Sequence, residues 1–231
     1  MAILNRAPAA SRTLRVLSAL LGYPDAALRA QLPEMLTALR EESAVPAPRL
    51  AELGVLINSL MLADPLEAEA EYVQIFDCGR ATSLHLFEHV HGDSRDRGPA
   101  MIDLAQTYEQ AGLFLEPGEL PDYLPVALEF ASTQPPREAR AFLGEIAHIL
   151  DALHAALAQR GTRYAAVAAA LLEIAGEKPT AIVPAAEPPL DESWTEPPAF
   201  DGCSAKGQAR PGQAQPIRII RGTNARQGVS S

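Results

Sequence analysis

The chain has 231 residues, a net charge of −10, and 48% hydrophobic and 21% charged residues, a composition typical of a soluble globular protein with one sizeable core. The acidic balance argues against a nucleic-acid partner, and no run of about 18 apolar residues is present to span a membrane. Arg12 and Arg15 interrupt the partly apolar N-terminus, which therefore predicts an amphipathic helix rather than a signal peptide. We expect a cytoplasmic protein.

Helices are predicted from the N-terminus to about Gly176, because apolar residues recur at helical spacing between prolines and glycines. The expected helices cover residues 14–21, 24–39, 50–60, 64–79, 83–91, 99–111, 121–132, 135–161 and 164–174. Asp64 and Pro65 look like an N-cap followed by a proline at the first helical position, and Pro33 is a point where the second helix could break. No stretch alternates as a half-buried strand does, so the predicted fold is an all-α, single-domain helical bundle.

After Lys178 the composition changes. Residues 179–231 are rich in proline, alanine and glycine and carry no helical stripe, which is typical of a disordered segment. We therefore expect a helical domain at 1–178 and a disordered tail at 179–231. The tail has five acidic and five basic residues, so the net charge of −10 belongs to the helical domain. Trp194 lies in the tail, either as a docking element or as an unpacked residue.

The two cysteines, Cys78 and Cys203, form neither a disulfide framework nor a CxxC pair. Cys78 is predicted to be a buried or half-buried thiol rather than a nucleophile.

Three of the five histidines lie in the stretch 83–98, SLHLFEHVHGDSRDRG. On the expected helix, His85 and His89 are four residues apart and share a face, the spacing that zinc needs from two imidazoles, with Glu88 beside them as a general base. A catalytic zinc also needs a third protein ligand, and the sequence singles out none. Histidines in the last turn of a helix, such as His89 and His91, can instead bind free carbonyls and favour the negative end of the helix dipole. A structural role for these histidines is therefore the stronger interpretation, ahead of a zinc site.

Acidic and basic residues alternate directly after this helix. Such residues can form carboxylate–guanidinium pairs that rigidify an interhelical loop, or their carboxylates can hold a basic peptide. Rigidifying the loop is the expected role of Arg95, Asp96 and Arg97.

A family resemblance rests on two blocks. Residues 69–113, EAEYVQIFDCGRATSLHLFEHVHGDSRDRGPAMIDLAQTYEQAGL, strongly resemble the NarJ family, the nitrate reductase molybdenum cofactor assembly chaperones, also called the delta subunit. Residues 119–130, ELPDYLPVALEF, are similar to the E-x-P-D-H element of the wider TorD-like chaperones, with Tyr123 where that family typically has histidine. Both blocks lie within the helical domain, and the tail matches no motif of the family.

The resemblance implies an all-helical, cytoplasmic chaperone that is not an enzyme, binds no cofactor permanently, and assists molybdenum cofactor insertion into its client. The implied client is the alpha subunit of respiratory nitrate reductase, alone or in the alpha–beta complex, recognised through its N-terminal segment before it docks at the membrane. We expect no nucleic-acid partner and no stable membrane insertion.

The resemblance and the residues together predict a client site. An apolar groove between helices can take the apolar face of a client helix, while surrounding carboxylates engage its basic residues. The predicted carboxylate contacts are Asp77, Glu88, Asp93, Glu119 and Asp122. The predicted aromatic contacts are Tyr72, Phe76, Phe87 and Tyr123, with core packing as the alternative for Phe76 and Phe87. The predicted site also includes His85, His89 and His91, whose titration near neutral pH would make client binding pH-sensitive.

Two other classes of protein stay open. A zinc-dependent hydrolase would use His85, Glu88 and His89, and would purify with stoichiometric metal. A helical adaptor for another client would bind partners without affecting nitrate reductase assembly.

Overall fold

A computed structural model describes residues 9–90, 97–116 and 118–180 of the chain. Within these residues the chain forms ten α-helices and no strand, which confirms the all-α prediction. The helices are α1 (Ser11–Leu20), α2 (Ala26–Glu42), α3 (Ala47–Leu62), α4 (Pro65–Phe76), α5 (Leu86–Val90), α6 (Arg97–Gln110), α7 (Leu124–Thr133), α8 (Pro136–Glu145), α9 (Ala147–Gln159) and α10 (Ala165–Ala175), with a 3₁₀ turn, η1, at Arg80–Thr82. Of the predicted tail, only residues 179 and 180 are described, and Thr180 donates hydrogen bonds to the Asp151 carboxylate.

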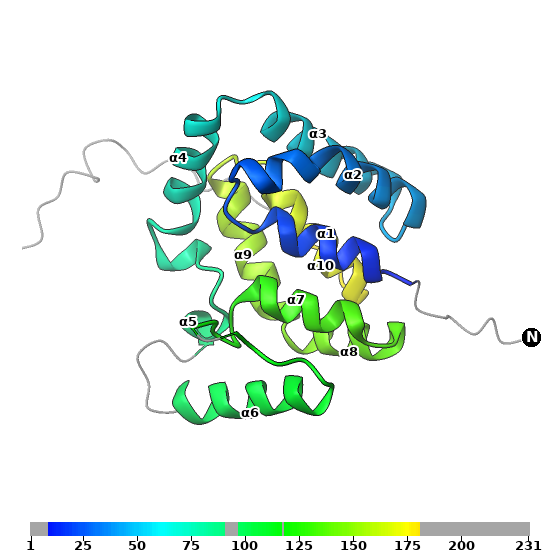
Figure 1. Ribbon diagram of the computed structural model, residues 1–231, viewed down its shortest axis with the longest axis vertical. Helices are drawn as coiled ribbons and strands as arrows, with labels where there is room; N and C mark the ends of the chain where they lie inside the picture. Colours follow the sequence, from blue (N-terminus) through cyan, green and yellow to red (C-terminus); the bar gives the residue numbers. More distant parts are fainter. Residues whose placement is uncertain (1–8, 91–96, 117, 181–231) are drawn as a thin grey trace, which may run out of the picture. The chain divides into compact units, whose positions relative to one another are not determined.

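Helix α10 is the centre of the core. Its sequence, AAVAAALLEIA, is buried except at Ala165 and Glu173, as expected for a helix that is apolar on all sides. It packs against α1, α3, α8 and α9, and α1 in turn packs against α2 and α7 (Figure 1). Leucines of these helices fill one continuous apolar cluster.

The helix ends follow from local sequence. Asp64 caps α4 by accepting a hydrogen bond from the Leu66 N–H at 2.9 Å, and Pro65 is the first helical residue, as predicted. Helix α10 ends at Gly176, whose φ of 90° is a left-handed conformation that favours glycine. Helix α2 runs through Pro33 without a break, so the residues around this proline stay helical despite the missing N–H donor.

The prediction of one long helix over 135–161 is wrong. This segment forms two helices, α8 and α9, with a bend of 67° between them at Ile146. Both pack on α10, α8 through Ala139 and Leu143, and the bend lets the two short helices cover one central helix. In the described ranges no single helix is long and apolar enough to cross a bilayer; only the bent pair of α8 and α9 reaches that length and apolarity together.

Two other predicted helices begin too early. The segments 83–91 and 121–132 become helical only at Leu86 and Leu124, because the residues just before them pair with each other. His85 and Tyr123 form an isolated antiparallel β-bridge, in which the Leu124 N–H donates to the Leu84 carbonyl at 2.8 Å and the Leu86 N–H to the Asp122 carbonyl at 2.9 Å.

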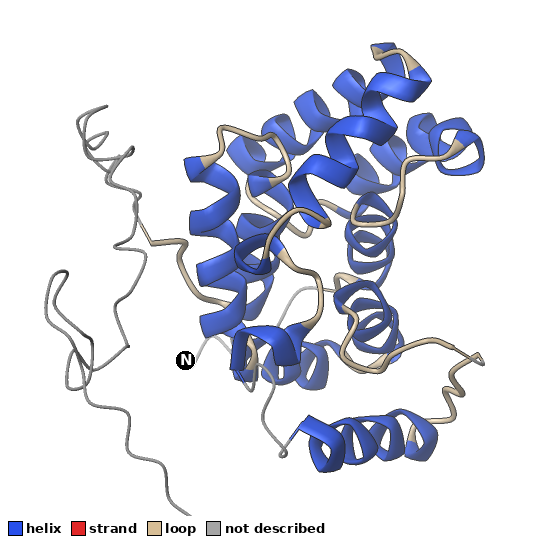
Figure 2. Cartoon of the chain, turned by 90° about the vertical axis from the view of Figure 1, so that its left-hand side faces the viewer, coloured by secondary structure: helices blue, strands red, loops and turns tan. Residues whose placement is uncertain are grey.

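Helix α6 is held by a second, smaller apolar cluster, formed by Tyr108, Val126 and Phe130. The rings of Tyr108 and Phe130 lie 4.7 Å apart, and the Tyr108 hydroxyl donates to the Pro121 carbonyl at 3.0 Å. Figure 2 shows α6 at the lower end of the helical body, and a long connection leads from α6 to α7.

Candidate functional site

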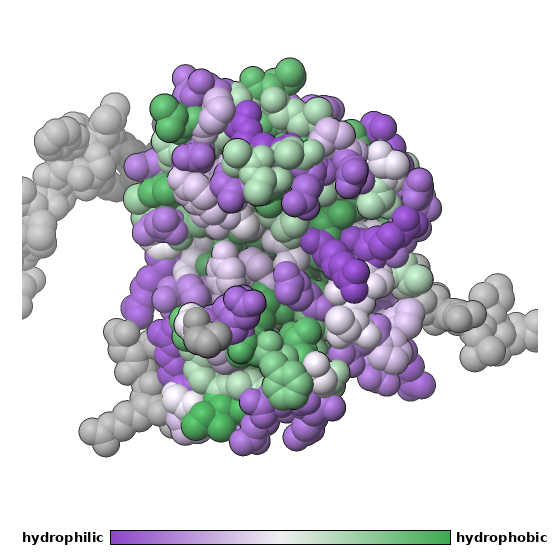
Figure 3. All heavy atoms as spheres, viewed as in Figure 1, coloured by the Kyte–Doolittle hydropathy of each residue, from purple (hydrophilic) through white to green (hydrophobic). Residues whose placement is uncertain are grey.

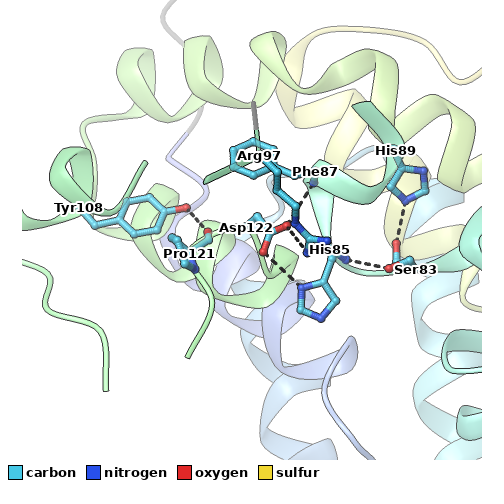
Figure 4. A network of polar contacts seen from close by, with 8 residues as sticks. All are labelled: Ser83, His85, Phe87, His89, Arg97, Tyr108, Pro121 and Asp122. Atoms are coloured by element: carbon cyan, nitrogen blue, oxygen red, sulfur yellow. Dashed lines mark hydrogen bonds and ion pairs between the residues drawn. The ribbon is translucent and has the colours of Figure 1, made fainter. Parts of the chain in front are cut away.

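Asp122 is a buried carboxylate where three segments meet. Its side chain is fully buried, and one oxygen lies 3.3 Å from His85 Nδ1. The other accepts from the Phe87 N–H at 3.3 Å and lies 3.6 Å from Nη2 of Arg97 (Figure 4). A buried carboxylate is tolerated only when it is paired and hydrogen-bonded. Asp122 therefore ties the start of α5 and the start of α6 to the segment that leads into α7.

The pKa of the His85 imidazole is raised above its ordinary value. The main cause is the hydrogen bond to Asp122, with further Coulomb contributions from Asp122 and Glu88, while partial burial and Arg97 act in the opposite direction. The ring also lies 5.3 Å from the ring of Tyr123. Protonated His85 is therefore favoured in the folded chain over the unfolded chain.

The predicted pairing of His85 with His89 on one helical face is wrong. His85 precedes α5 in the β-bridge and turns toward Asp122, whereas His89 lies on α5 with its Nε2 2.9 Å from the Ser83 carbonyl oxygen (Figure 4). The described residues contain no group of three His, Cys, Asp or Glu side chains placed to hold a metal ion. The ligand pair on which the hydrolase alternative depended is thus absent from the described geometry.

Arg97, predicted to rigidify the loop after the histidine helix, pairs with a distant acid. It begins α6 and reaches Asp122, an acid 25 positions further along the chain, rather than a neighbour in sequence. The other residues predicted for this loop and its client contacts lie outside the described residues: His91, Asp93, Arg95 and Asp96.

Tyr72 and Phe76 lie in the core. Both are buried, their rings are 4.8 Å apart, and both pack edge-on against Tyr164. The Tyr72 hydroxyl donates to the Leu21 carbonyl at 2.7 Å, and burial raises the Tyr72 pKa far above its usual value. At the end of α4, Asp77 is exposed, and so is Cys78, contrary to the prediction for that thiol.

The segments that meet at Asp122 also carry exposed and half-buried residues, and the sequence did not predict the apolar ones among them. Phe87, Glu88 and Tyr123 are half-buried, and Glu119 is exposed. Three apolar side chains that were not predicted lie on the same segments: Val90 is 51% exposed, Phe114 76% and Leu120 43%. We call these seven residues the α5–α7 surface. Figure 3 shows apolar atoms gathered over α6 and the connection from α6 to α7. The one feature of the sequence that could have indicated these exposed apolar residues is the short apolar run 113–115, which lies outside any predicted helix.

The fold resembles that of a solved structure from an archaeon. A crystal structure of a proposed redox enzyme maturation protein from Archaeoglobus fulgidus superimposes with a TM-score of 0.50 at 20% identity, covering 72% of this chain and 94% of the other. At this identity the likeness shows that the two chains share an all-α fold.

The sequence comparisons identify the family. The model of the nitrate reductase delta subunit family matches residues 23–170. The chain is 49% identical over 162 residues to the nitrate reductase molybdenum cofactor assembly chaperone NarJ of Escherichia coli K12, covering 70% of this chain and 69% of NarJ. It is 43% identical over 163 residues to NarW of the same strain, covering 71% and 68%. The chain belongs to the nitrate reductase delta subunit family, as its sequence motifs predicted.

Proposed function

We propose that this chain is an assembly chaperone for respiratory nitrate reductase that assists molybdenum cofactor insertion into the catalytic alpha subunit. The observation that carries the proposal is the 49% identity to NarJ, which is named as a nitrate reductase molybdenum cofactor assembly chaperone. In this proposal the chain binds a protein client and is not itself an enzyme, and the cofactor is cargo for the client rather than a group that the chaperone keeps. The chaperone would act in the cytoplasm, before the client docks at the membrane.

The proposed contact is the N-terminal segment of the alpha subunit, free or within the alpha–beta complex, bound at the α5–α7 surface. The exposed side chains of Val90, Phe114 and Leu120 offer an apolar strip, and burying a large apolar side chain contributes about 1.5–3 kcal/mol. The carboxylates of Glu88 and Glu119 lie on the same segments. An amphipathic client helix with basic flanks would satisfy both.

Three residues of the predicted client site are buried and so do not belong to the exposed surface. Asp122 fixes the backbone of α5 through the Phe87 N–H, and Tyr72 and Phe76 fill the core. In the proposal these three residues position the surface, and the client touches Glu88, Glu119 and the exposed apolar residues.

The first test is a calorimetric titration of the full chain with a synthetic peptide from the N-terminus of the alpha subunit. We expect near-stoichiometric binding, weakened at least tenfold, or about 1.4 kcal/mol, by Phe114→Asp or by Leu120→Asp. The matched control is Leu66→Asp, which adds the same charge at an exposed leucine on α4. Equal affinity for the wild type and both site variants would refute the proposed surface.

The second test addresses the role in assembly. Deleting the gene should leave nitrate reductase subunits present but lacking molybdenum cofactor, and the wild-type chain should restore cofactor content. A helical adaptor for another client would leave the cofactor content unchanged.

The histidines of the site supply a third test. Because Asp122 favours protonated His85, client affinity should change between about pH 6 and 8, the range in which histidine titrates. A flat affinity over this range would remove the hypothesis.

A further inference from the structure

Helix α3 has an outer side that nothing in the described chain covers. From Leu53 to Ala63 it contains no charged residue, and its inner side is buried through Leu53, Leu56, Ile57 and Leu60. On the outer side Val55 is 56% exposed, Met61 42% and Leu62 87%. Exposed apolar side chains that gather on one side of a helix mark a surface that can bind a partner. Leu62 is the most exposed of the large apolar side chains that the structure describes.

The same outer side carries a small cavity. Its volume is about 220 Å³, and it lies between α3 and the start of α10, lined by Glu52, Val55, Thr162, Arg163, Ala165 and Ala166. Val55 and Leu62 are seven residues apart, which puts them on one side of the helix at a separation of about 10 Å. One face of α3 thus bears both a projecting leucine and an apolar-walled hollow.

We propose that this face binds a second copy of the chain, with the two α3 helices antiparallel about a twofold axis and each Leu62 inserted into the partner's cavity beside Val55. A twofold interface requires a surface that is complementary to itself, and α3 supplies both halves of such a contact. The axis passes midway between Val55 and Leu62, next to Asn58. Asn58 is exposed, and its amide can donate to and accept from the same amide of the partner.

The charge distribution favours a second copy over a basic client segment. A chain with net charge −10 repels its own copies, and the uncharged stretch of α3 is a place where two copies approach with little repulsion. Glu52, at the edge of the cavity, already forms an ion pair with Arg49. A basic helix would find carboxylates at the α5–α7 surface but none along this stretch. In Figure 1 α3 lies at the upper end of the helical body and α6 at the lower end.

The contact is small, since few large side chains take part. Stable interfaces bury roughly 800 Å² per partner, so the dimer is weak and depends on concentration. Added salt screens the repulsion between acidic copies and strengthens the association, whereas it weakens contacts that depend on opposite charges.

Sedimentation velocity of the full chain, from about 5 to 500 μM, tests the proposal. We expect the mean mass to rise toward that of two chains, further at high salt, and Leu62→Glu to stay monomeric throughout. The matched control is Ile102→Glu, which places the same charge at a 59% exposed residue of α6 and should dimerise like the wild type. A monomer at every concentration, or a dimer that Leu62→Glu leaves intact, overturns the proposal. Loss of client binding in Leu62→Glu without any wild-type dimer would assign the face to the client and also overturn it.

Disulfide trapping tests the geometry. In a Cys78→Ser, Cys203→Ser background, Leu62→Cys mixed with Arg163→Cys should give a cross-linked dimer on mild oxidation, because Arg163 lines the cavity that receives Leu62. Leu62→Cys alone should cross-link far less, since the antiparallel arrangement keeps the two Leu62 positions apart. Equal cross-linking in both samples would refute the twofold arrangement.

Discussion

Replacing Asp122 tests whether one buried carboxylate holds the candidate site together. In Asp122→Ala the Phe87 N–H, His85 and Arg97 all lose their shared acceptor. Breaking a fully buried ion pair costs about 3–5 kcal/mol. The side chains of His85 and Arg97 are 32% and 29% exposed, so water replaces part of the lost interaction. We therefore expect a loss of about 2–3 kcal/mol in the free energy of unfolding.

Urea denaturation followed by circular dichroism measures this loss. With a slope of about 2 kcal/mol per molar urea, the midpoint should fall by about 1–1.5 M at an unchanged slope. Asp122→Asn keeps an acceptor for the Phe87 N–H but loses the charge, and should cost less than the alanine variant. The matched control, Asp103→Asn, changes an exposed acid of α6 and should stay within about 0.5 kcal/mol of the wild type. A similarly small effect for Asp122→Ala would refute the reasoning.

Three further predictions concern single contacts. His85 has a raised folded-state pKa, so its contribution to stability is full below its unfolded pKa of about 6.5 and is lost as pH rises through the folded pKa; His85→Gln should flatten this fall in urea titrations between pH 6 and 8. Tyr108→Phe removes the buried bond to the Pro121 carbonyl and should lower the unfolding free energy by about 1–2 kcal/mol, whereas an unchanged value would show that the bond contributes nothing. Gly176→Ala places a methyl group on a residue whose φ of 90° is left-handed, next to the Arg140 guanidinium, and should lower the melting temperature by several degrees, or about 1–2 kcal/mol; an unchanged melting temperature would contradict the backbone strain.

Some contacts of the candidate site could be predicted from the sequence and others could not. The motif blocks directed attention to His85, Asp122 and Tyr123, and the structure brings these three together through the β-bridge and the Asp122 carboxylate. Helical spacing wrongly joined His85 to His89, because a period of 3.6 residues applies only where the backbone is helical. The exposure of Phe114 and Leu120 could not be predicted, because the identity of an apolar loop residue does not show whether it is buried or open to solvent.

The sequence by itself determined the helical class, the cap at Asp64 and the family, because these depend on local spacing, local hydrogen bonds and a long motif. Only the tertiary structure decided the bend at Ile146, the short helix at Leu86 and the pairing of Arg97 with Asp122. Each of these involves residues distant in sequence: α8 and α9 both pack on α10, the β-bridge with Tyr123 comes before the start of α5, and Arg97 pairs with a carboxylate 25 positions away. Periodicity reports which side of a helix is apolar, but the packing of the whole chain decides whether that side is covered.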